Sequence, residues 1–123
     1  MEFSQPKGIY LQIADQIRDR ILDGEWIEGE RIPSIRELAV SLGVNPNTVT
    51  KSYQALTDRQ IIANQRGLGY FVATGAKATI LNEIKNEFVR DELPRVFRIM
   101  RLLDMNIDEL AEHYGDDTGE QTS

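Results

Sequence analysis

The side chains of this chain best suited to chemistry are polar hydrogen-bonding groups between positions 45 and 51. They are Asn45, Asn47, Thr48, Thr50 and Lys51, with no acidic residue after them until Asp58. A solvated helix face usually mixes in Glu or Asp, so their absence is informative. Amides, hydroxyls and a lysine hydrogen-bond phosphate oxygens and base edges. The segment therefore predicts a surface for double-stranded DNA.

A second candidate contact is the sequence Arg66-Gly67-Leu68-Gly69. Two short apolar runs, 61–64 and 70–73, flank it and predict a hairpin. Glycine lets the backbone approach a phosphate closely, and an arginine adds a charge-assisted donor. Alone, such a tip is more often a plain turn, but its position directly after two capped helices favours phosphate contact.

Two short capped helices are expected to position these groups. Ser34 and Glu37 fit a capping box at the start of a helix over 35–42, and Gly43 suits its end. Asn45 can cap the next helix, with Pro46 pre-set for its first position. This order of elements predicts a helix-turn-helix followed by a β-wing.

An amphipathic helix over 9–22 is expected to complete the core. Its apolar face comprises Tyr10, Ile13, Ala14, Ile17 and Ile21. Its outer face is expected to carry Asp15, Gln16, Arg18 and Asp19.

Beyond Gly75 the pattern predicts a helix over 79–93, which Pro94 ends or kinks, then helices over 95–103 and 107–114. These helices present more apolar surface than so short a segment can bury alone, which favours a two-fold dimer over helices that simply fold back. The expected dimerisation residues are Ile80, Leu81, Ile84, Phe88, Val96, Phe97, Met100 and Leu103. The tail, GDDTGEQTS, offers nothing apolar to bury and is expected to be disordered.

The charge of the chain is unevenly distributed. The 123 residues carry a net charge of −6. Residues 31–75 hold five basic and two acidic side chains, a net +3, whereas residues 76–123 hold six basic and eleven acidic ones, a net −5. Salt screens charges more than about 8–10 Å away, so the local field at a contact face decides phosphate attraction. The total charge predicts weak non-specific binding and leaves specific binding open.

The amino-acid composition bears on disulfides, metal sites and membrane segments. There is no cysteine, which excludes disulfides and thiolate metal sites. No apolar run approaches the roughly 18–20 residues of a membrane span, and the first ten residues do not resemble a secretory signal. We therefore expect a soluble cytoplasmic protein without membrane contact.

The expected fold is mostly α with a small β-wing, as a winged helix-turn-helix domain followed by two or three short C-terminal helices. We expect a DNA-binding domain over 1–75, a dimerisation region over 76–114 and a disordered acidic tail over 115–123.

The motifs together resemble the GntR family of bacterial transcription regulators. The matching marks are Pro33-Ser34-x-Arg36-Glu37-Leu38-Ala39, Leu42-Gly43-Val44 and Arg66-Gly67-x-Gly69-x-Phe71-Val72, over roughly residues 7–75. The resemblance implies DNA contacts from the arginine of the first motif, the start of the second helix and the wing tip. The implied DNA-binding set is Ser34, Arg36, Asn45, Asn47, Thr48, Thr50, Lys51, Arg66, Gly67, Leu68 and Gly69.

One motif departs from the common family pattern. Many members carry two arginines at the start of the recognition helix, where this chain reads Asn45-Pro46-Asn47-Thr48-Val49-Thr50. This form looks like the YtrA-type branch, whose members have a short C-terminal helical region and often lie beside ABC-transporter genes. A full effector domain of other branches, of about 150 residues, has no room here.

These observations predict a homodimeric, sequence-specific repressor that binds a palindromic operator. The resemblance to the YtrA-type branch implies that this operator belongs to a transporter operon. The alternative is a winged helix used for protein–protein contact through the acidic tail. Enzymatic chemistry has little support, because the sole histidine, His113, lies among acidic residues that suit a solvated helix end better than a metal site. We expect no cofactor and no metal. A small-molecule effector, of unknown identity, would bind at the dimer groove or at the hinge near Gly75.

Overall fold

The computed structural model describes residues 8–122, with side chains described from 8 to 117. Residues 1–7 and Ser123, which belong to the expected first domain and tail, lie outside the described residues. The chain forms two compact units, one ending at Glu83 and one beginning at Ile84. The expected boundary after residue 75 is therefore too early, because Ala76 and Ile80 are completely buried in the first unit.

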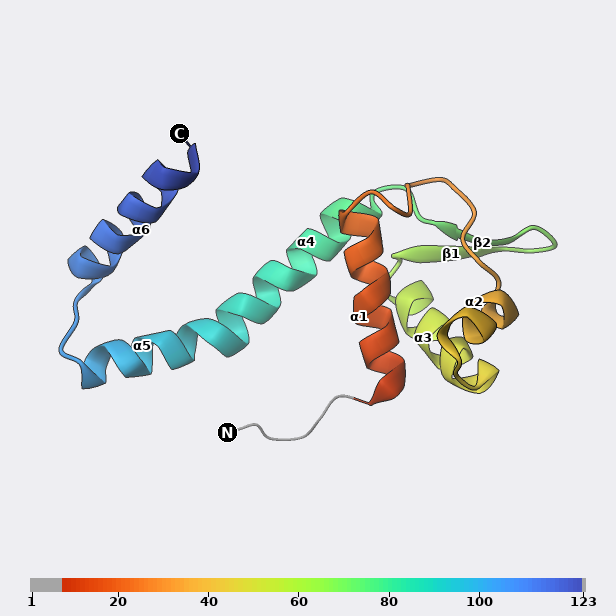
Figure 1. The fold of residues 1–123 in the computed structure, drawn as a ribbon, viewed down its shortest axis with the longest axis horizontal. Helices are drawn as coiled ribbons and strands as arrows, with labels where there is room; N and C mark the ends of the chain where they lie inside the picture. The colour runs from red at the N-terminus through yellow and green to blue at the C-terminus, as the bar shows by residue number, and fades with distance from the viewer. Residues whose placement is uncertain (1–7, 123) are drawn as a thin grey trace. The chain divides into compact units, whose positions relative to one another are not determined.

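Three helices of the first unit match the periodicity of the sequence (Figure 1). They are α1 (Ile9–Leu22), α2 (Ile35–Leu42) and α3 (Pro46–Asp58). The capping box before α2 is confirmed: the Glu37 N–H donates to Ser34 Oγ over 3.0 Å, and the Ser34 N–H donates to Glu37 Oε1 over 2.8 Å. Gly43 ends α2 in the left-handed region at a φ of 68°, which only glycine adopts without strain.

The wing is an antiparallel pair, β1 (Ile62–Gln65) and β2 (Gly69–Val72). Both strands lie one residue closer to the tip than we expected. Gln65 pairs with Gly69, and the Leu68 N–H donates to the Gln65 carbonyl over 2.9 Å, which leaves a turn of only three residues. The register is the one that the expected strands imply, since Asn64 pairs with Tyr70 in both; only the ends differ, because the polar Gln65 and the side-chain-free Gly69 gave no strand signal.

The core of the first unit lies where α1, α3 and the wing meet. Its completely buried side chains include Ala14, Val49, Tyr53, Leu56, Ile61 and Ile80. On α1, Ile13, Ala14, Ile17 and Ile21 are buried as the helical periodicity predicts, whereas Tyr10 is half-buried.

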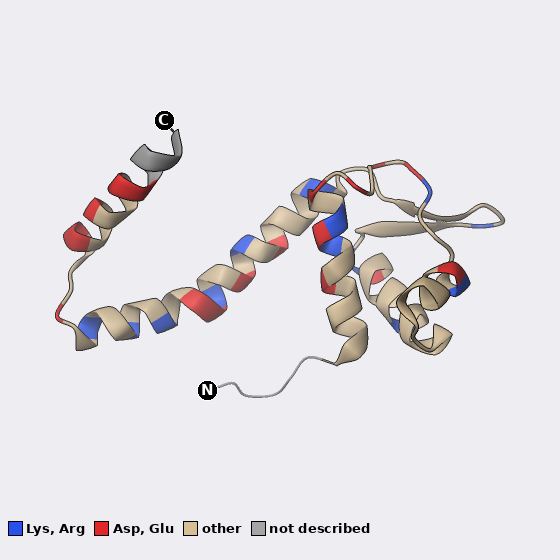
Figure 2. Ribbon diagram, in the orientation of Figure 1, with Lys and Arg blue, Asp and Glu red and all other residues tan. Residues whose placement is uncertain are grey.

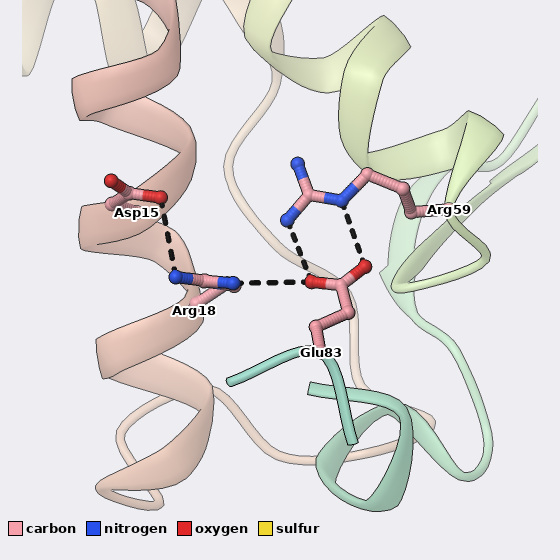
Figure 3. Close-up of polar contacts among 4 residues, drawn as sticks. All are labelled: Asp15, Arg18, Arg59 and Glu83. Atoms are coloured by element: carbon pink, nitrogen blue, oxygen red, sulfur yellow. Dashed lines mark hydrogen bonds and ion pairs between the residues drawn. The ribbon is translucent and has the colours of Figure 1, made fainter. Parts of the chain in front are cut away.

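Arg18 contradicts its expected place on the outer face of α1, since it is only 8% exposed. Its guanidinium lies 3.2 Å from Glu83 Oε1 and 3.4 Å from Asp15 Oδ1. Arg59 completes this cluster with two hydrogen bonds to Glu83, of 2.9 and 2.8 Å (Figure 3). The periodicity of α1 could not reveal this arrangement, because the carboxylate that makes burial of Arg18 tolerable comes from a residue far along the chain.

The helices that follow the wing are α4 (Ala76–Glu87), the π-helical segment η1 (Phe88–Glu92), α5 (Leu93–Leu102) and α6 (Ile107–Thr122). The first begins at Ala76 rather than at residue 79. The carboxylate of Glu28 accepts hydrogen bonds from the backbone N–H groups of Gly75 and Lys77, at 2.8 and 3.0 Å, and so caps this earlier start. A cap supplied from residue 28 cannot be read from the local sequence.

Pro94 was expected to end or kink the helix, and it does not end it. No non-helical residue stands between α4 and α5, and Pro94 occupies the first turn of α5. The Leu93 N–H donates to the Phe88 carbonyl, a π-type bond across five residues. This wider turn accommodates a residue that lacks an N–H and would crowd an ordinary helical turn.

The last helix is longer than the predicted span of 107–114 and continues to Thr122. The structure therefore differs from the expectation of a disordered tail over 115–122. Asn106 and Glu109 form a second capping box, with bonds of 2.9 and 3.3 Å. Asp108 and Glu109 in the first turn also suit the positive end of the helix dipole.

Candidate nucleic-acid interface

The outer face of α3 is open to solvent while its inner face is fixed in the core. Asn47, Thr50 and Lys51 are exposed, Thr48 is half-buried, and Val49 is completely buried. The exposed polar residues of this helix lie on one face, as expected from the sequence.

Tyr53 ties α3 to the two other elements of the interface. Its hydroxyl donates to the Pro33 carbonyl over 2.6 Å, directly before the α2 cap. Its ring meets that of Tyr70 in β2 edge to face, with centroids 4.8 Å apart. Burial raises the pKa of the Tyr53 hydroxyl, so it remains protonated and can donate throughout the physiological range. One buried side chain thus sets α2 and the wing relative to α3.

Ser52 makes a comparable connection to α1. Its buried hydroxyl lies 2.7 Å from the Tyr10 carbonyl and 3.1 Å from that of Thr48, so the two acceptors share one hydrogen. The bond to Tyr10 fixes the rotation of α3 about its axis. That rotation decides which side chains face outward.

The polar residues of α3 differ in what they can still bond. The Asn45 side-chain oxygen already accepts from the Asn47 N–H at 2.8 Å, and the Thr50 hydroxyl donates to the Pro46 carbonyl at 3.0 Å. Asn45 keeps its NH₂ group for a ligand, and Thr50 keeps its methyl group and oxygen lone pairs. Within the described part of the chain, the side chains of Asn47 and Lys51 make no hydrogen bond or ion pair.

The α2 start and the wing tip add the remaining predicted residues. Arg36 is exposed, and Ser34 retains a hydroxyl hydrogen because its oxygen acts only as an acceptor in the cap. At the tip, Arg66, Gly67 and Leu68 are exposed, whereas Gly69 is half-buried. Gly67 has a φ of 78°, so the tip requires glycine there for its backbone shape alone.

The structure changes which arginines contribute charge at this surface. Arg59 was counted in the net +3 of residues 31–75, but both of its hydrogen bonds go to Glu83. The basic residues that remain are Arg31, Arg36, Lys51 and Arg66. Arg31 was not among the predicted site residues; it lies beside β2, where it forms a bridge with Phe71. Such a contact between segments far apart in sequence leaves no local pattern.

In the second unit, η1 carries Arg90, Asp91 and Glu92, whereas α5 carries only basic charges and the described part of α6 only acidic ones (Figure 2). Within the described residues, no three His, Asp or Glu side chains are grouped so that they could hold a metal ion. No described helix is long and apolar enough to cross a membrane.

Ile80 is buried in the first unit, which removes it from the predicted dimerisation residues while that unit is folded. Met100 is only 6% exposed within its own chain, and Ile84 and Val96 are half-buried. The other predicted residues remain exposed: Leu81, Phe88, Phe97 and Leu103. Further exposed apolar residues that we did not list are Val89, Ile99, Leu102 and Ile107.

Two cavities bear on ligand binding, one in each unit. In the second unit, a groove of about 440 Å³ is lined almost entirely by apolar side chains of η1, α5 and α6, among them Phe88, Val96 and Leu110. In the first unit, a cavity of about 370 Å³ lies between Ile21, Trp26 and Lys77, close to Gly75.

Comparison with known proteins identifies similar chains. Residues 9–72 match the family described as bacterial regulatory proteins, gntR family. The chain is 34% identical over 104 residues to the HTH-type transcriptional repressor YtrA of Bacillus subtilis, covering 85% of this chain and 79% of YtrA.

Solved structures share both the whole fold and the first unit. A crystal structure from Bacteroides thetaiotaomicron, described as a transcriptional regulator of the GntR family, has 44% identity and a TM-score of 0.82, covering 93% of this chain and 99% of that one. The DNA-binding domain of AraR, crystallised in complex with an operator, has 28% identity and a TM-score of 0.51, covering 59% of this chain and 95% of that one.

Proposed function

We propose, because the chain belongs to the GntR family of bacterial regulatory proteins, that it is a homodimeric repressor that binds a palindromic operator. Membership makes it a DNA-binding transcriptional regulator with a helix-turn-helix. The dimer, the repression and the symmetry of the operator are the proposal.

The outer face of α3 is the observation that carries this proposal. Its exposed side chains are free of acidic groups until Asp58, and the buried contacts of Ser52 and Tyr53 hold that face outward. A surface of this kind suits the major groove, where amides and hydroxyls reach base edges. Two exposed arginines come before and after α3 in the chain: Arg36 near the start of α2 and Arg66 at the wing tip.

The proposed roles follow from side-chain chemistry. Arg36, Lys51 and Arg66 carry the charges that bind phosphates, while Asn47, Thr48 and Thr50 approach base edges. Ser34, Gly67 and Gly69 offer donors or close backbone approach to the DNA backbone. Leu68, exposed at the tip, adds an apolar contact to the sugar–phosphate wall.

The dimer is supported by the exposed apolar surface of the second unit. Phe88 is 49% exposed, Leu103 65% and Leu102 83%, in a unit with few buried residues of its own. A second copy is the economical cover for such a surface, because two-fold contacts use the same patch twice. The exposed residues of η1, α5 and α6 are therefore the proposed interface.

Selection from a pool of random-sequence duplexes, followed by footprinting of the enriched sequence, tests the operator. We expect an inverted repeat whose half-sites lie about one helical turn apart, roughly 34–36 Å. Enrichment of a single half-site, or no enrichment at low salt, would contradict the proposal.

Transcription in vitro from a promoter that contains the repeat should fall when the protein is added; stimulation would contradict repression.

The regulated genes and the effector are further parts of the proposal. The YtrA-like sequence supports a transporter operon as the target, and transcript levels in a deletion strain would test this: transporter genes should rise. The apolar groove of the second unit and the cavity near Gly75 are the two proposed effector sites. A ligand that is an effector should raise the melting temperature of the protein and also change its affinity for the operator. A ligand that raises the melting temperature without changing that affinity is not an effector.

A further inference from the structure

We propose that Arg31 is a phosphate contact of the wing, and that Gly69 lacks a side chain so that the Arg31 guanidinium can lie across it. This inference rests on the proposed DNA-binding function and adds a residue to it. Nothing in the sequence motifs pointed to Arg31, which precedes the α2 capping box.

The backbone around Arg31 is held to the free edge of β2. The Gly29 N–H donates to the Val72 carbonyl over 2.8 Å, and the Ile32 N–H donates to the Tyr70 carbonyl over 2.9 Å. In return, the Val72 N–H donates to the Glu30 carbonyl over 3.0 Å. Residues 29–32 therefore act as a short third strand of the wing, and the position of Arg31 is fixed by backbone bonds on both of its sides.

This pairing sets the face on which Arg31 projects. Arg31 stands opposite Phe71 in the bridge, so the two side chains share a face of the wing. Tyr70 and Val72 occupy the opposite face, where Tyr70 meets Tyr53 and Val72 is buried. Arg31 thus lies on the side of the wing turned away from the core, and its diagonal neighbour toward the tip is Gly69.

The guanidinium occupies the space that a side chain at Gly69 would need. A β-carbon placed on Gly69 would lie 3.0 Å from Arg31 Nε, 3.5 Å from Nη2 and 3.6 Å from Cζ. No such conflict exists at Gly67, the other glycine of the tip, where a β-carbon would meet nothing within 4 Å. Gly69 also has a φ of 114°, so its backbone shape and the approach of Arg31 both favour glycine.

In the part of the chain that the structure describes, Arg31 is exposed and lacks an ion-pair partner, like Arg36 and Arg66 and unlike three other arginines of this unit. Arg18 and Arg59 bind Glu83, and Arg20 stacks on Trp26 at 5.3 Å and faces Glu25 at 3.9 Å. Arg31 is exposed and forms no ion pair or side-chain hydrogen bond within the described residues. The charge of Arg31 acts on the Glu37 carboxylate without direct contact, so a guanidinium whose backbone is held beside a glycine tip keeps all its N–H donors for an anion. In a DNA-binding wing that anion is a backbone phosphate.

The test compares the salt dependence of binding in matched variants. The probe is a fluorescein-labelled duplex enriched by the wild-type protein from a random-sequence pool, and binding is followed by anisotropy. Arg31→Ala should weaken binding about tenfold and reduce the slope of log K against log salt by about 0.9, the loss of one phosphate contact. Lys85→Ala is the control, because it removes one exposed positive charge from α4, outside α2, α3 and the wing; its slope should match that of wild type.

A double-mutant cycle tests the role of Gly69. Gly69→Ala should weaken binding more in the wild-type background than in the Arg31→Ala background, because the clash with the guanidinium exists only when Arg31 is present. The backbone strain at Gly69 is the same in both backgrounds and cancels. Additive effects would overturn the proposed fit between the two residues.

The outcomes separate this inference from the proposed function. If wild type binds the probe and Arg31→Ala has the slope of Lys85→Ala, the inference fails and the function stands. If wild type enriches no sequence and binds no duplex at low salt, the proposed function itself fails. Melting temperatures equal to that of wild type are expected for Arg31→Ala and Lys85→Ala, since both side chains are exposed.

Discussion

Arg36 on α2 and Lys51 on α3 are exposed basic residues that the proposed interface uses as phosphate contacts. Replacing either with Ala should lower affinity for all duplexes by a similar factor and reduce the salt slope by about one.

Asn47→Ala should instead lower affinity mainly for the selected sequence, because an amide that reads a base edge carries sequence information. Competition between the selected duplex and a scrambled duplex measures the difference. An unchanged salt slope in both cationic variants would exclude them as phosphate contacts.

Glu83 is a residue on which the folding of the first unit depends. Hydrogen bonds from Arg59, together with the charges of Arg59 and Arg18, hold the pKa of this carboxyl below its usual value despite partial burial. Glu83→Gln keeps the shape but removes the charge, so the bonds to both arginines weaken. We expect a loss of about 2–3 kcal/mol in the free energy of unfolding, measured with urea.

The pH dependence of that loss follows from the direction of the shift. A carboxyl with a lowered pKa stabilises the fold above its unfolded value, about 4.3, and this contribution disappears as the pH falls through its folded value. The stability difference between wild type and Glu83→Gln should therefore be constant at neutral pH and shrink below about pH 4.3. A difference that stays constant into acid would show that the charge of Glu83 is not what stabilises the unit. Arg90, paired with Asp91 on the exposed surface, offers the control: Asp91→Asn should have little effect.

At the scale of elements, Tyr53 connects α3, the start of α2 and the wing. Tyr53→Phe keeps the ring against Tyr70 but removes the hydrogen bond to the Pro33 carbonyl. We expect a loss of about 1 kcal/mol in unfolding free energy and a weaker affinity for the selected duplex, since α2 is then less firmly placed. Unfolding in urea and anisotropy measure the two effects. Stability lowered without any change in affinity would mean that this bond does not position the interface.

The helices and strands also show which structural features can be predicted from local sequence and which cannot. The caps at Ser34 and Asn45 and the left-handed Gly43 are short-range signals, and they predicted both ends of α2 and the start of α3. The exposed polar face of α3 followed from the same helical period. Features that depend on distant partners were missed: the burial of Arg18 against Glu83, the cap of α4 by Glu28 and the place of Arg31 beside β2.

Other differences have local causes that the pattern leaves undecided. The strands extend one residue closer to the tip than expected, because Gln65 and Gly69 pair through their backbones although neither has a side chain typical of a strand. Pro94 suggested a break, but a π-type bond from Leu93 to Phe88 lets the helix continue. The low apolar content of the tail suggested disorder, yet the helix that the capping box at Asn106 starts continues to Thr122.

At the scale of the whole molecule, the proposed dimer depends on the apolar surface of the second unit. Phe88→Asp places a charge in the groove that Leu93, Val96 and Leu110 line. It should convert the dimer into a monomer and weaken operator binding, because a single copy can occupy only one half-site. Light scattering after gel filtration measures the mass.

A control for this dimer variant comes from the first unit. Ile27 is 51% exposed, close to the 49% of Phe88. Ile27→Asp should therefore leave the mass unchanged. The proposed interface would be contradicted if Phe88→Asp remained a dimer like Ile27→Asp, or if the wild-type protein were a monomer at micromolar concentration.

The most direct test of the account is an anisotropy titration of the wild-type protein against the selected duplex and a scrambled duplex of the same composition. We expect tighter binding to the selected duplex by at least about a thousandfold at physiological salt, with two chains bound per duplex. Equal affinity for both duplexes, or no binding to either at low salt, would contradict sequence-specific DNA binding by this protein.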